Sequence, residues 1–292
     1  SMMRAMLLKR KKQPDPKPIA LPEQIKEEIE EKQVQERVAI GAHVVHETIR
    51  REGEEELQRT TSALAWSGLA AGLSMGFSLV AEGLLSAYLP DAAWAPLLSK
   101  LGYSVGFLIV VLGRQQLFTE TTLTAVLPLL SKRDAPTAIG MLRLWGTVLL
   151  ANVVGTYLFA FCVAKVPLFP AHVQQALTTV SLGGTEGGFG VIFMRAVFAG
   201  WLIALMVWLL PAAESAKVSI IIITTYLIGL GGFNHVIAGS VKILFLVVTG
   251  ALTPGDYFFR FFFPTLLGNI VGGVSLVAFL GHAQVVAGKD AE

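Results

Sequence analysis

One histidine, His235, lies inside an apolar run, Val218–Ala251, that is longer than the ~20 residues needed to span a bilayer. The residues just before it, Gly231–Asn234, predict that a helix is interrupted at this point. Non-helical backbone is tolerated at membrane depth only where protein or a water-filled cavity satisfies its polar groups. An ionisable side chain at such an interruption indicates a transport site. Histidine can supply a proton or become a cation as pH falls, and the helix ends beside it can supply N–H groups.

The charged residues are segregated along the chain. Residues 1–60 contain 12 Lys and Arg and 12 Asp and Glu, which leaves 11 and 9 for the remaining 232 residues. The mean hydropathy of +0.62 and the charged fraction of 15% are typical of an integral membrane protein, since soluble chains average ~25% charged residues. We therefore expect a cytoplasmic N-terminal segment at 1–60, a transmembrane channel domain at 61–285 and a cytoplasmic tail at 286–292.

The N-terminal segment has three parts. A basic cluster, Arg4–Lys12, is not followed by an apolar region with a cleavage site, so we expect no secretory signal. A proline-rich linker follows, and Glu23–Gln58 reads as a charged helix with a rough apolar stripe that Gly41 and Gly53 weaken. This helix either lies on the cytoplasmic face, bundles with copies of itself or binds a cytoplasmic partner.

Six apolar segments follow, and they predict an all-α membrane protein. Their approximate bounds are 62–88, 99–131, 137–164, 189–211, 217–250 and 260–284. The second and fifth are too long for one straight span, and each has a polar interruption near its middle. We therefore expect transmembrane helices 2 and 5 to be broken.

An internal repeat relates the two interruptions. Leu149–Gly155 in the third segment matches Leu266–Gly272 in the sixth at an offset of 117 positions, and the same offset carries Phe118 onto His235. Three segments per half is an odd number, so the halves must be inverted relative to each other. Broken helices in corresponding positions of two inverted halves indicate a permeation site at the midplane.

The basic residues of the connecting loops predict the orientation. With the N-terminus inside, the inner loops contain more Lys and Arg than the outer connections, by a modest margin. We expect a multi-pass protein of the bacterial inner membrane with both termini in the cytoplasm.

Four motifs in order resemble the formate/nitrite transporter family. They are Leu117-Phe-Thr119, Phe193-Met-Arg-Ala-Val197, Phe233-Asn-His235 and Gly268-Asn-Ile-Val-Gly-Gly273. The resemblance covers roughly residues 60–285, and the long N-terminal extension with the Arg-Gln-Gln before Leu117 most resembles the YfdC-type branch.

The resemblance implies an aquaporin-like protomer in a homopentamer, with one pore per protomer for a small monovalent anion or its acid. It implies that Thr119 and His235 form the central site. It further implies that the flanking positions line the pore: Asn234, Leu117, Phe118, Tyr103, Phe107, Ile228 and Phe233.

Several positions depart from the family pattern. The lysine that family members usually carry before the fourth helix is absent from Glu186–Phe189, and Val236, Gly239 and Asn234 replace more polar or charged residues. We therefore expect weaker anion attraction at the outer mouth and a histidine that has lost several hydrogen-bond partners.

Two other functions remain open. The missing lysine and Glu186 favour a neutral small-solute pore, and the N-terminal helix favours a pentameric scaffold with a nearly silent pore. An enzyme is not expected, because the chain shows no nucleophile–base pair, phosphate loop or metal cluster. His43 and His46 lack a third placed ligand, so we expect no metal and no cofactor. Nothing in the net charge of +2 indicates a nucleic-acid partner; the lipid bilayer is the expected environment.

Overall fold

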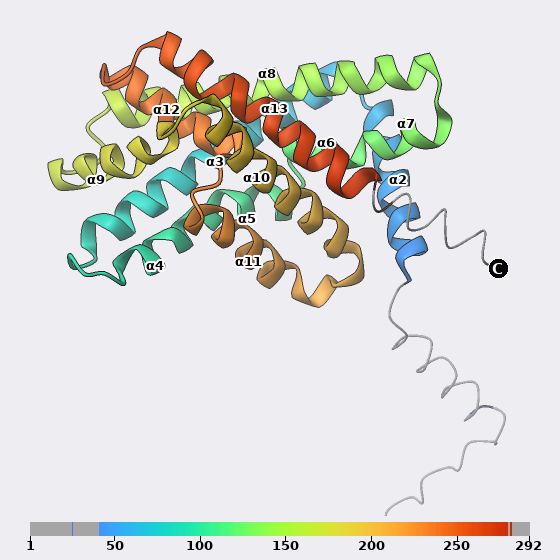
Figure 1. Cartoon of the computed structure of the whole chain (residues 1–292), viewed down its shortest axis with the longest axis horizontal. Helices are drawn as coiled ribbons and strands as arrows, with labels where there is room; N and C mark the ends of the chain where they lie inside the picture. The colour runs from blue at the N-terminus through green and yellow to red at the C-terminus, as the bar shows by residue number, and fades with distance from the viewer. Residues whose placement is uncertain (1–24, 26–40, 280, 282–292) are drawn as a thin grey trace, which may run out of the picture. The chain divides into compact units, whose positions relative to one another are not determined.

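The computed structural model describes residue 25, residues 41–279 and residue 281. The basic cluster, the proline-rich linker, the start of the predicted N-terminal helix and the tail at 286–292 fall outside the described residues. Contacts group the chain from Gly41 onward into one compact unit. All regular secondary structure in the described residues is helical, and short non-helical stretches connect the helices, as Figure 1 shows.

The predicted segments correspond to helices with closely similar bounds. The first is α3 (Thr61–Tyr88), the third α8 (Ala135–Lys165), and the fourth α10 (Phe189–Leu209) with the short turns η3 (Leu210–Ala212) and η4 (Glu214–Ala216) after it. The sixth comprises the π-helical η5 (Asp256–Phe262), α13 (Phe263–Val271) and the π-helical η6 (Gly272–Phe279).

The second and fifth segments each contain helices separated by a short non-helical stretch. The second runs through α4 (Ala95–Ser99), η1 (Lys100–Tyr103) and α5 (Ser104–Leu112), and then resumes as α6 (Phe118–Thr124) and α7 (Val126–Lys132). The fifth consists of α11 (Lys217–Leu230) and α12 (Val236–Thr249).

Five helical stretches in the described residues are long and apolar enough to cross a membrane. They are Thr61–Tyr88, Ala95–Leu112, Ala135–Lys165, Phe189–Ala212 and Asp256–Ser275. The helices α11 and α12 have 14 residues each, or about 21 Å, and each alone is shorter than a ~30 Å hydrocarbon core.

Helix ends follow local sequence signals. The Thr60 side chain accepts a hydrogen bond from the Ala63 amide, and the Asp134 side chain accepts one from the Thr137 amide, so that α3 and α8 begin with capped turns. The C-terminal end of α12 is followed by Gly250, which adopts the left-handed conformation with φ of 83°. One helix was not anticipated: α9 (Ala171–Leu182), with the turn η2 (Gly183–Thr185) after it, lies between the third and fourth segments, where its polar side chains break up the apolar signal.

Two long helix pairs form the frame around the two non-helical stretches. The helix α3 packs along α8, and α10 packs along α13. Both pairs approach closely through glycine: a Cβ on Gly72 would lie 2.2 Å from the Asn152 carbonyl oxygen, and a Cβ on Gly200 would lie 2.3 Å from the Asn269 carbonyl oxygen. Backbones that come this close place any side chain on the neighbouring helix with little freedom.

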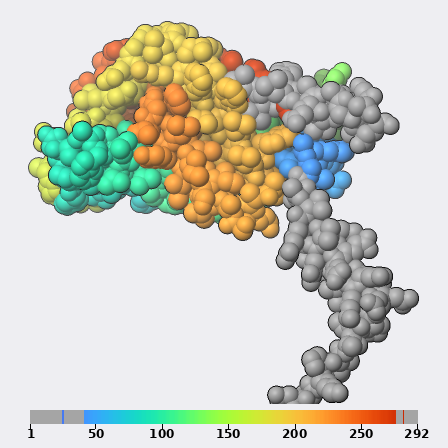
Figure 2. All heavy atoms as spheres, turned by 60° about the horizontal axis from the view of Figure 1, so that its bottom comes forward, coloured from blue at the N-terminus to red at the C-terminus, as the bar shows by residue number. Residues whose placement is uncertain are grey.

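The helices α5 and α11 pack against each other on one side of this frame. The Tyr226 hydroxyl of α11 donates a hydrogen bond to the Leu97 carbonyl at 2.8 Å, and the Thr225 hydroxyl donates one to Ser104 Oγ, also at 2.8 Å. Figure 2 shows the atoms of α11 (orange) beside those of the α4–η1 region (teal).

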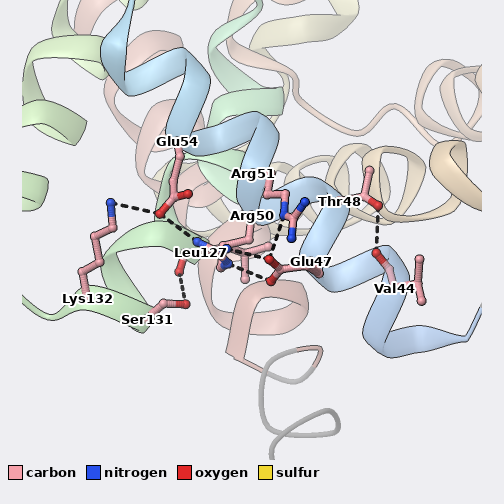
Figure 3. Close-up of polar contacts among 9 residues, drawn as sticks. All are labelled: Val44, Glu47, Thr48, Arg50, Arg51, Glu54, Leu127, Ser131 and Lys132. Atoms are coloured by element: carbon pink, nitrogen blue, oxygen red, sulfur yellow. Dashed lines mark hydrogen bonds and ion pairs between the residues drawn. The ribbon is translucent and has the colours of Figure 1, made fainter.

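The helix α2 (Ala42–Gln58) is the described part of the predicted N-terminal helix, and it packs on α6, α7, α8 and α10. Val45 and Ile49 of its apolar stripe are buried against this group of helices. A Lys132–Glu54 ion pair of 2.9 Å joins α7 to α2, and Glu54 also pairs with Arg50 at 2.7 Å (Figure 3). These contacts hold α2 beside the helices that follow the first non-helical stretch.

Candidate functional site

The two non-helical stretches bring Thr119 and His235 into contact. Thr119 lies in the first turn of α6 and His235 is the residue before α12, and 116 positions separate them along the chain. Their side chains form a hydrogen bond of 2.7 Å between Thr119 Oγ1 and His235 Nε2. The structure thus brings together the two residues that the family resemblance implies for the central site.

The other ring nitrogen of His235 fixes the tautomer. Nδ1 accepts hydrogen bonds from the backbone amides of Ile237 at 3.3 Å and Ala238 at 3.1 Å, so the side chain caps α12. A nitrogen that accepts carries no hydrogen, and the neutral ring therefore carries its hydrogen on Nε2. It follows that Nε2 donates to Thr119 Oγ1, and that the Thr119 hydroxyl keeps its own hydrogen available to a further acceptor.

The first non-helical stretch is held by Asn152 of α8. Its Oδ1 accepts from the Phe118 amide at 2.9 Å, while its Nδ2 donates to the carbonyls of Gln116 at 2.9 Å and Gly68 at 2.7 Å. The Gln116 amide donates in turn to Ser67 Oγ at 3.0 Å. The backbone around Leu117 is thus satisfied by the α3–α8 pair, as buried irregular backbone requires.

The second non-helical stretch is held by Asn269 of α13. Its Oδ1 accepts from the Val236 amide at 2.8 Å, and its Nδ2 donates to the carbonyls of Asn234 at 2.9 Å and Ala196 at 2.8 Å. The first amides of α12 are therefore all occupied, by Asn269 and by His235. The expectation that free helix-end N–H groups face a permeant is wrong for α12, and the Thr119 hydroxyl is a donor that remains beside His235.

The predicted lining residues lie in one apolar cluster around this pair. Tyr103, Phe107, Leu117, Phe118 and Ile228 are all buried and share a core cluster, with Phe233 packed against it. The Phe107 ring lies edge-on to the His235 ring with centroids 5.0 Å apart, and the Tyr103 ring lies 5.4 Å from Phe107. In this conformation the site is closed to solvent, because Thr119 is 0% and His235 1% exposed.

Asn234 and Phe233 sit at the edge of the cluster. The Asn234 side chain donates to the Gly184 carbonyl at 2.9 Å, while its buried Oδ1 has no partner among the described residues. The Phe233 ring stacks on Phe198 with centroids 5.4 Å apart. Both side chains thus connect the second non-helical stretch to its neighbours rather than to the Thr119–His235 bond.

The predicted loss of hydrogen-bond partners by His235 is not seen, since both of its ring nitrogens are bonded. At the sequence stretch that lacks the family lysine, the Glu186 carbonyl accepts a hydrogen bond from Arg195 at 2.9 Å. No group of three or more potential metal ligands occurs in the part of the chain that the structure describes.

Sequence reasoning gave no role to Asn152 and Asn269. A signal was present, because both asparagines occupy the same place in the repeated heptads Leu149–Gly155 and Leu266–Gly272. There was also no local sign in the sequence that Glu82 would bind both Lys100 and Lys242.

Comparisons with known proteins identify the family. The family model described as formate/nitrite transporter matches residues 43–283. The inner membrane protein YfdC of Escherichia coli (strain K12) is 44% identical over 251 residues, which cover 86% of this chain and 81% of that protein. The formate channel BtFdhC of Bacillus thuringiensis is 27% identical over 243 residues, which cover 80% of this chain and 92% of that channel.

Solved structures share the fold. A pentameric formate channel with formate bound superposes with a TM-score of 0.65 at 20% identity, over 77% of this chain and 98% of its own. An FNT family ion channel superposes with a TM-score of 0.72 at 19% identity, over 84% of this chain and 99% of its own.

Proposed function

Since this chain belongs to the formate/nitrite transporter family, we propose that it carries a small monovalent anion, or the conjugate acid of that anion, across a bacterial inner membrane. Membership of this family makes it a transport protein and not an enzyme. The named formate channels among its relatives support an anion of this size.

The Thr119–His235 hydrogen bond carries the proposal. A dry apolar path resists a bare anion, because the loss of hydration costs several kcal/mol or more. The Thr119 hydroxyl offers one hydrogen to the permeant while His235 Nε2 donates to the same oxygen. A donor chain of this kind stabilises negative charge on the permeant, since each bond polarises the next.

The proton of a neutral acid would come from solution and not from His235. The neutral ring cannot give up its Nε2 hydrogen without becoming an anion, and its Nδ1 is enclosed by two backbone amides. We therefore propose that acid-dependent flux follows the protonation of the permeant itself.

The same pair of non-helical stretches supports an aquaporin-like protomer of six transmembrane helices in two inverted three-helix repeats. Asn152 and Asn269 make corresponding bonds, with the Phe118 and Val236 amides and with the Gln116 and Asn234 carbonyls. By these bonds Leu117 in the first half corresponds to His235 in the second, an offset of 118 positions. The repeated heptads had instead made Phe118 correspond to His235, an offset of 117. The asparagines keep the offset of 117, whereas the helix starts after the breaks, Phe118 and Val236, differ by 118.

Apolar side chains close the path on either side of the Thr119–His235 bond, and we propose that each side opens separately. Tyr103 and Phe107 lie on the α5 side of the Thr119–His235 bond, whereas Leu117 ends the first non-helical stretch and Phe118 begins α6. We propose that these residues, with Ile228, form two apolar constrictions that flank the central site. The pentameric neighbour supports a homopentamer with one such path per protomer, and the basic loop residues support cytoplasmic termini.

Flux into proteoliposomes tests the proposal. Formate, nitrite, acetate and hydrosulfide would be compared over a range from about pH 5.5 to about pH 7.5, which brackets the unperturbed titration of histidine. We expect flux that rises toward low pH and a pH profile that shifts with the acid strength of the permeant. A profile that is the same for every permeant would mean that a group of the protein titrates instead.

A second outcome would favour the neutral-solute pore. The central pair carries no net charge with His235 in the neutral form, so a small uncharged solute would also find a hydrogen-bond donor there. Flux of glycerol or urea in verified oligomers, with no flux of the four acids at any pH, would replace the anion by a neutral solute.

A further inference from the structure

Three charged side chains meet beside Tyr103. Glu82 of α3 binds Lys100 of η1 through Oε1, and it binds Lys242 of α12 through Oε2 at 2.6 Å. The Lys242 ammonium lies 5.2 Å from the centroid of the Tyr103 ring. Hereafter Glu82, Lys100 and Lys242 are called the charge cluster.

The charge cluster has a net charge of +1 when its three side chains are ionised. Two ammonium groups share one carboxylate, and no second carboxylate forms an ion pair with either lysine in the part of the chain described. The Glu82 side chain is 0% exposed and that of Lys242 is 9% exposed, whereas that of Lys100 is 27% exposed. The cluster therefore reaches from the protein surface to a site where solvent screens charge weakly.

A row of rings connects the charge cluster to the central pair. Tyr103 contacts Phe107, and Phe107 contacts His235. The Tyr103 carbonyl also accepts from Ser78 at 2.6 Å, which ties this residue to α3, the helix of Glu82. An anion that passes Tyr103 on its way to Thr119 thus comes close to Lys242.

We propose that the charge cluster is a binding site for the permeant anion at the Tyr103 constriction, and that its net positive charge sets the affinity for that anion. The inference rests on the proposed function. The Lys242 ammonium has three N–H groups and uses one for Glu82, so it can donate another to a monovalent oxyanion while Glu82 keeps it in place. Lys100, the most exposed member, attracts the anion from solution.

A brace between helices is the competing role for these three residues, since Glu82 joins α3, η1 and α12. A brace needs one carboxylate and one ammonium, and removing either partner of a buried pair destabilises the fold. A binding site makes a different demand, because affinity follows the sum of the charges. The two roles therefore predict different responses to the same substitutions.

Four variants separate the roles by charge. With all groups ionised, the cluster has a net charge of +1; Lys242→Gln lowers it to 0, Glu82→Gln raises it to +2, and the double variant Glu82→Gln/Lys242→Gln returns it to +1. Lys100→Gln also gives 0. Lys165→Gln makes the same change at the end of α8, where Lys165 has no ion pair among the described residues, and serves as the control.

The concentration of formate that gives half-maximal flux is the quantity to measure, in proteoliposomes at constant ionic strength. We expect it to rise roughly three- to tenfold in Lys242→Gln and Lys100→Gln and to fall by a similar factor in Glu82→Gln, as one unit of charge at short range would produce. Lys165→Gln should match the wild type, and the double variant, which regains the net charge but lacks the Lys242 donor, should lie between Lys242→Gln and the wild type. An equal loss of flux in all cluster variants, including Glu82→Gln and the double variant, would assign the cluster to bracing and overturn the inference.

A binding measurement keeps the two proposals apart. The shift of the thermal unfolding midpoint on replacing gluconate by formate, in detergent at constant ionic strength, reports anion binding without transport. We expect the shift to shrink in Lys242→Gln and to grow in Glu82→Gln. Wild-type protein that shows this shift but no flux would contradict the proposed function alone, whereas flux with a shift that ignores the cluster charge would contradict the binding site alone.

Discussion

Asn152 and Asn269 hold the two non-helical stretches by corresponding hydrogen bonds. Each side-chain oxygen accepts from the first amide of the helix that follows, and each side-chain nitrogen donates to a carbonyl of the stretch and to a carbonyl of the neighbouring long helix. Both residues are 0% exposed. The position of the central pair thus depends on two side chains that do not belong to it.

Replacing Asn269 by alanine removes three buried hydrogen bonds at once. We expect the free energy of unfolding to fall by about 2–5 kcal/mol, because the Val236 amide and two carbonyls lose their partner. Asn269→Asp places a buried carboxylate oxygen opposite the carbonyls of Ala196 and Asn234, so it should be at least as destabilising as alanine. Denaturant titration in detergent measures the stability of all three proteins. An alanine variant as stable as the wild type would contradict the role of Asn269 in holding the second non-helical stretch.

His235→Asn separates the two roles of the histidine. Asparagine is a good N-cap, so the stability of α12 should stay within a few tenths of a kcal/mol of wild type, whereas His235→Ala should lose about 1 kcal/mol. Both variants lack the Nε2–H that donates to Thr119. We therefore expect both to lower formate flux by at least about tenfold, the equivalent of one hydrogen bond. Wild-type flux in His235→Asn would show that capping alone explains the residue.

Thr119→Val tests the hydroxyl as the donor to the permeant. Valine has nearly the same shape, and it leaves His235 Nε2 without an acceptor as well as removing the hydroxyl. We expect anion flux to fall by about tenfold or more, and Thr119→Ser to retain most of it. Equal flux in the valine and serine variants, measured in proteoliposomes with the same protein content, would exclude the hydroxyl from the path.

The docking of α2 should depend on pH through Glu56. The Glu56 carboxylate accepts a hydrogen bond from the Thr124 hydroxyl at 2.6 Å and one from the side-chain amide of Gln116 at 3.0 Å. Burial outweighs both bonds and raises the pKa of Glu56 above its ordinary value of 4.5. At pH values between the ordinary pKa and the raised pKa of the folded state, the folded protein binds more protons than the unfolded chain. The free energy of unfolding therefore falls as pH rises through this range.

Glu56→Gln should remove this dependence. The glutamine amide can donate to Gln116 Oε1, a buried oxygen without a partner among the described residues, if the Gln116 amide turns over. We expect a higher unfolding midpoint at neutral pH and a flatter curve of midpoint against pH, with Glu55→Gln on the exposed side of α2 as the control. A slope equal to that of the wild type would contradict the assignment to Glu56.

Local pattern was enough to predict much of the fold. Apolar runs of spanning length predicted α3, α8 and α10 closely. The predicted interruptions, Gly113–Thr121 and Gly231–His235, contain the two non-helical stretches, although α6 already begins at Phe118. The family resemblance, which the comparisons confirm, selected Thr119 and His235.

The rest of the site depends on contacts between distant residues. Lys242 and Glu82 are 160 positions apart, and Asn152 reaches Gly68 across 84 positions, so neither pairing has a local signature. The occupied amides of α12 are of the same kind, because the capping role of Asn269 is visible only once α13 lies against α10. The sequence and its family resemblance selected Thr119 and His235 but not the side chains that hold them in place.

The two asparagines also impose an order on biogenesis. Asn152 belongs to a helix that leaves the ribosome after the stretch it holds, and Asn269 likewise follows its own stretch by 33 and 35 positions. During synthesis each stretch therefore enters the translocon with its polar backbone unpaired, and it can settle at membrane depth only when the later helix arrives. We therefore expect the second stretch to close late in insertion, once α13 lies against α10 and Asn269 reaches the Val236 amide.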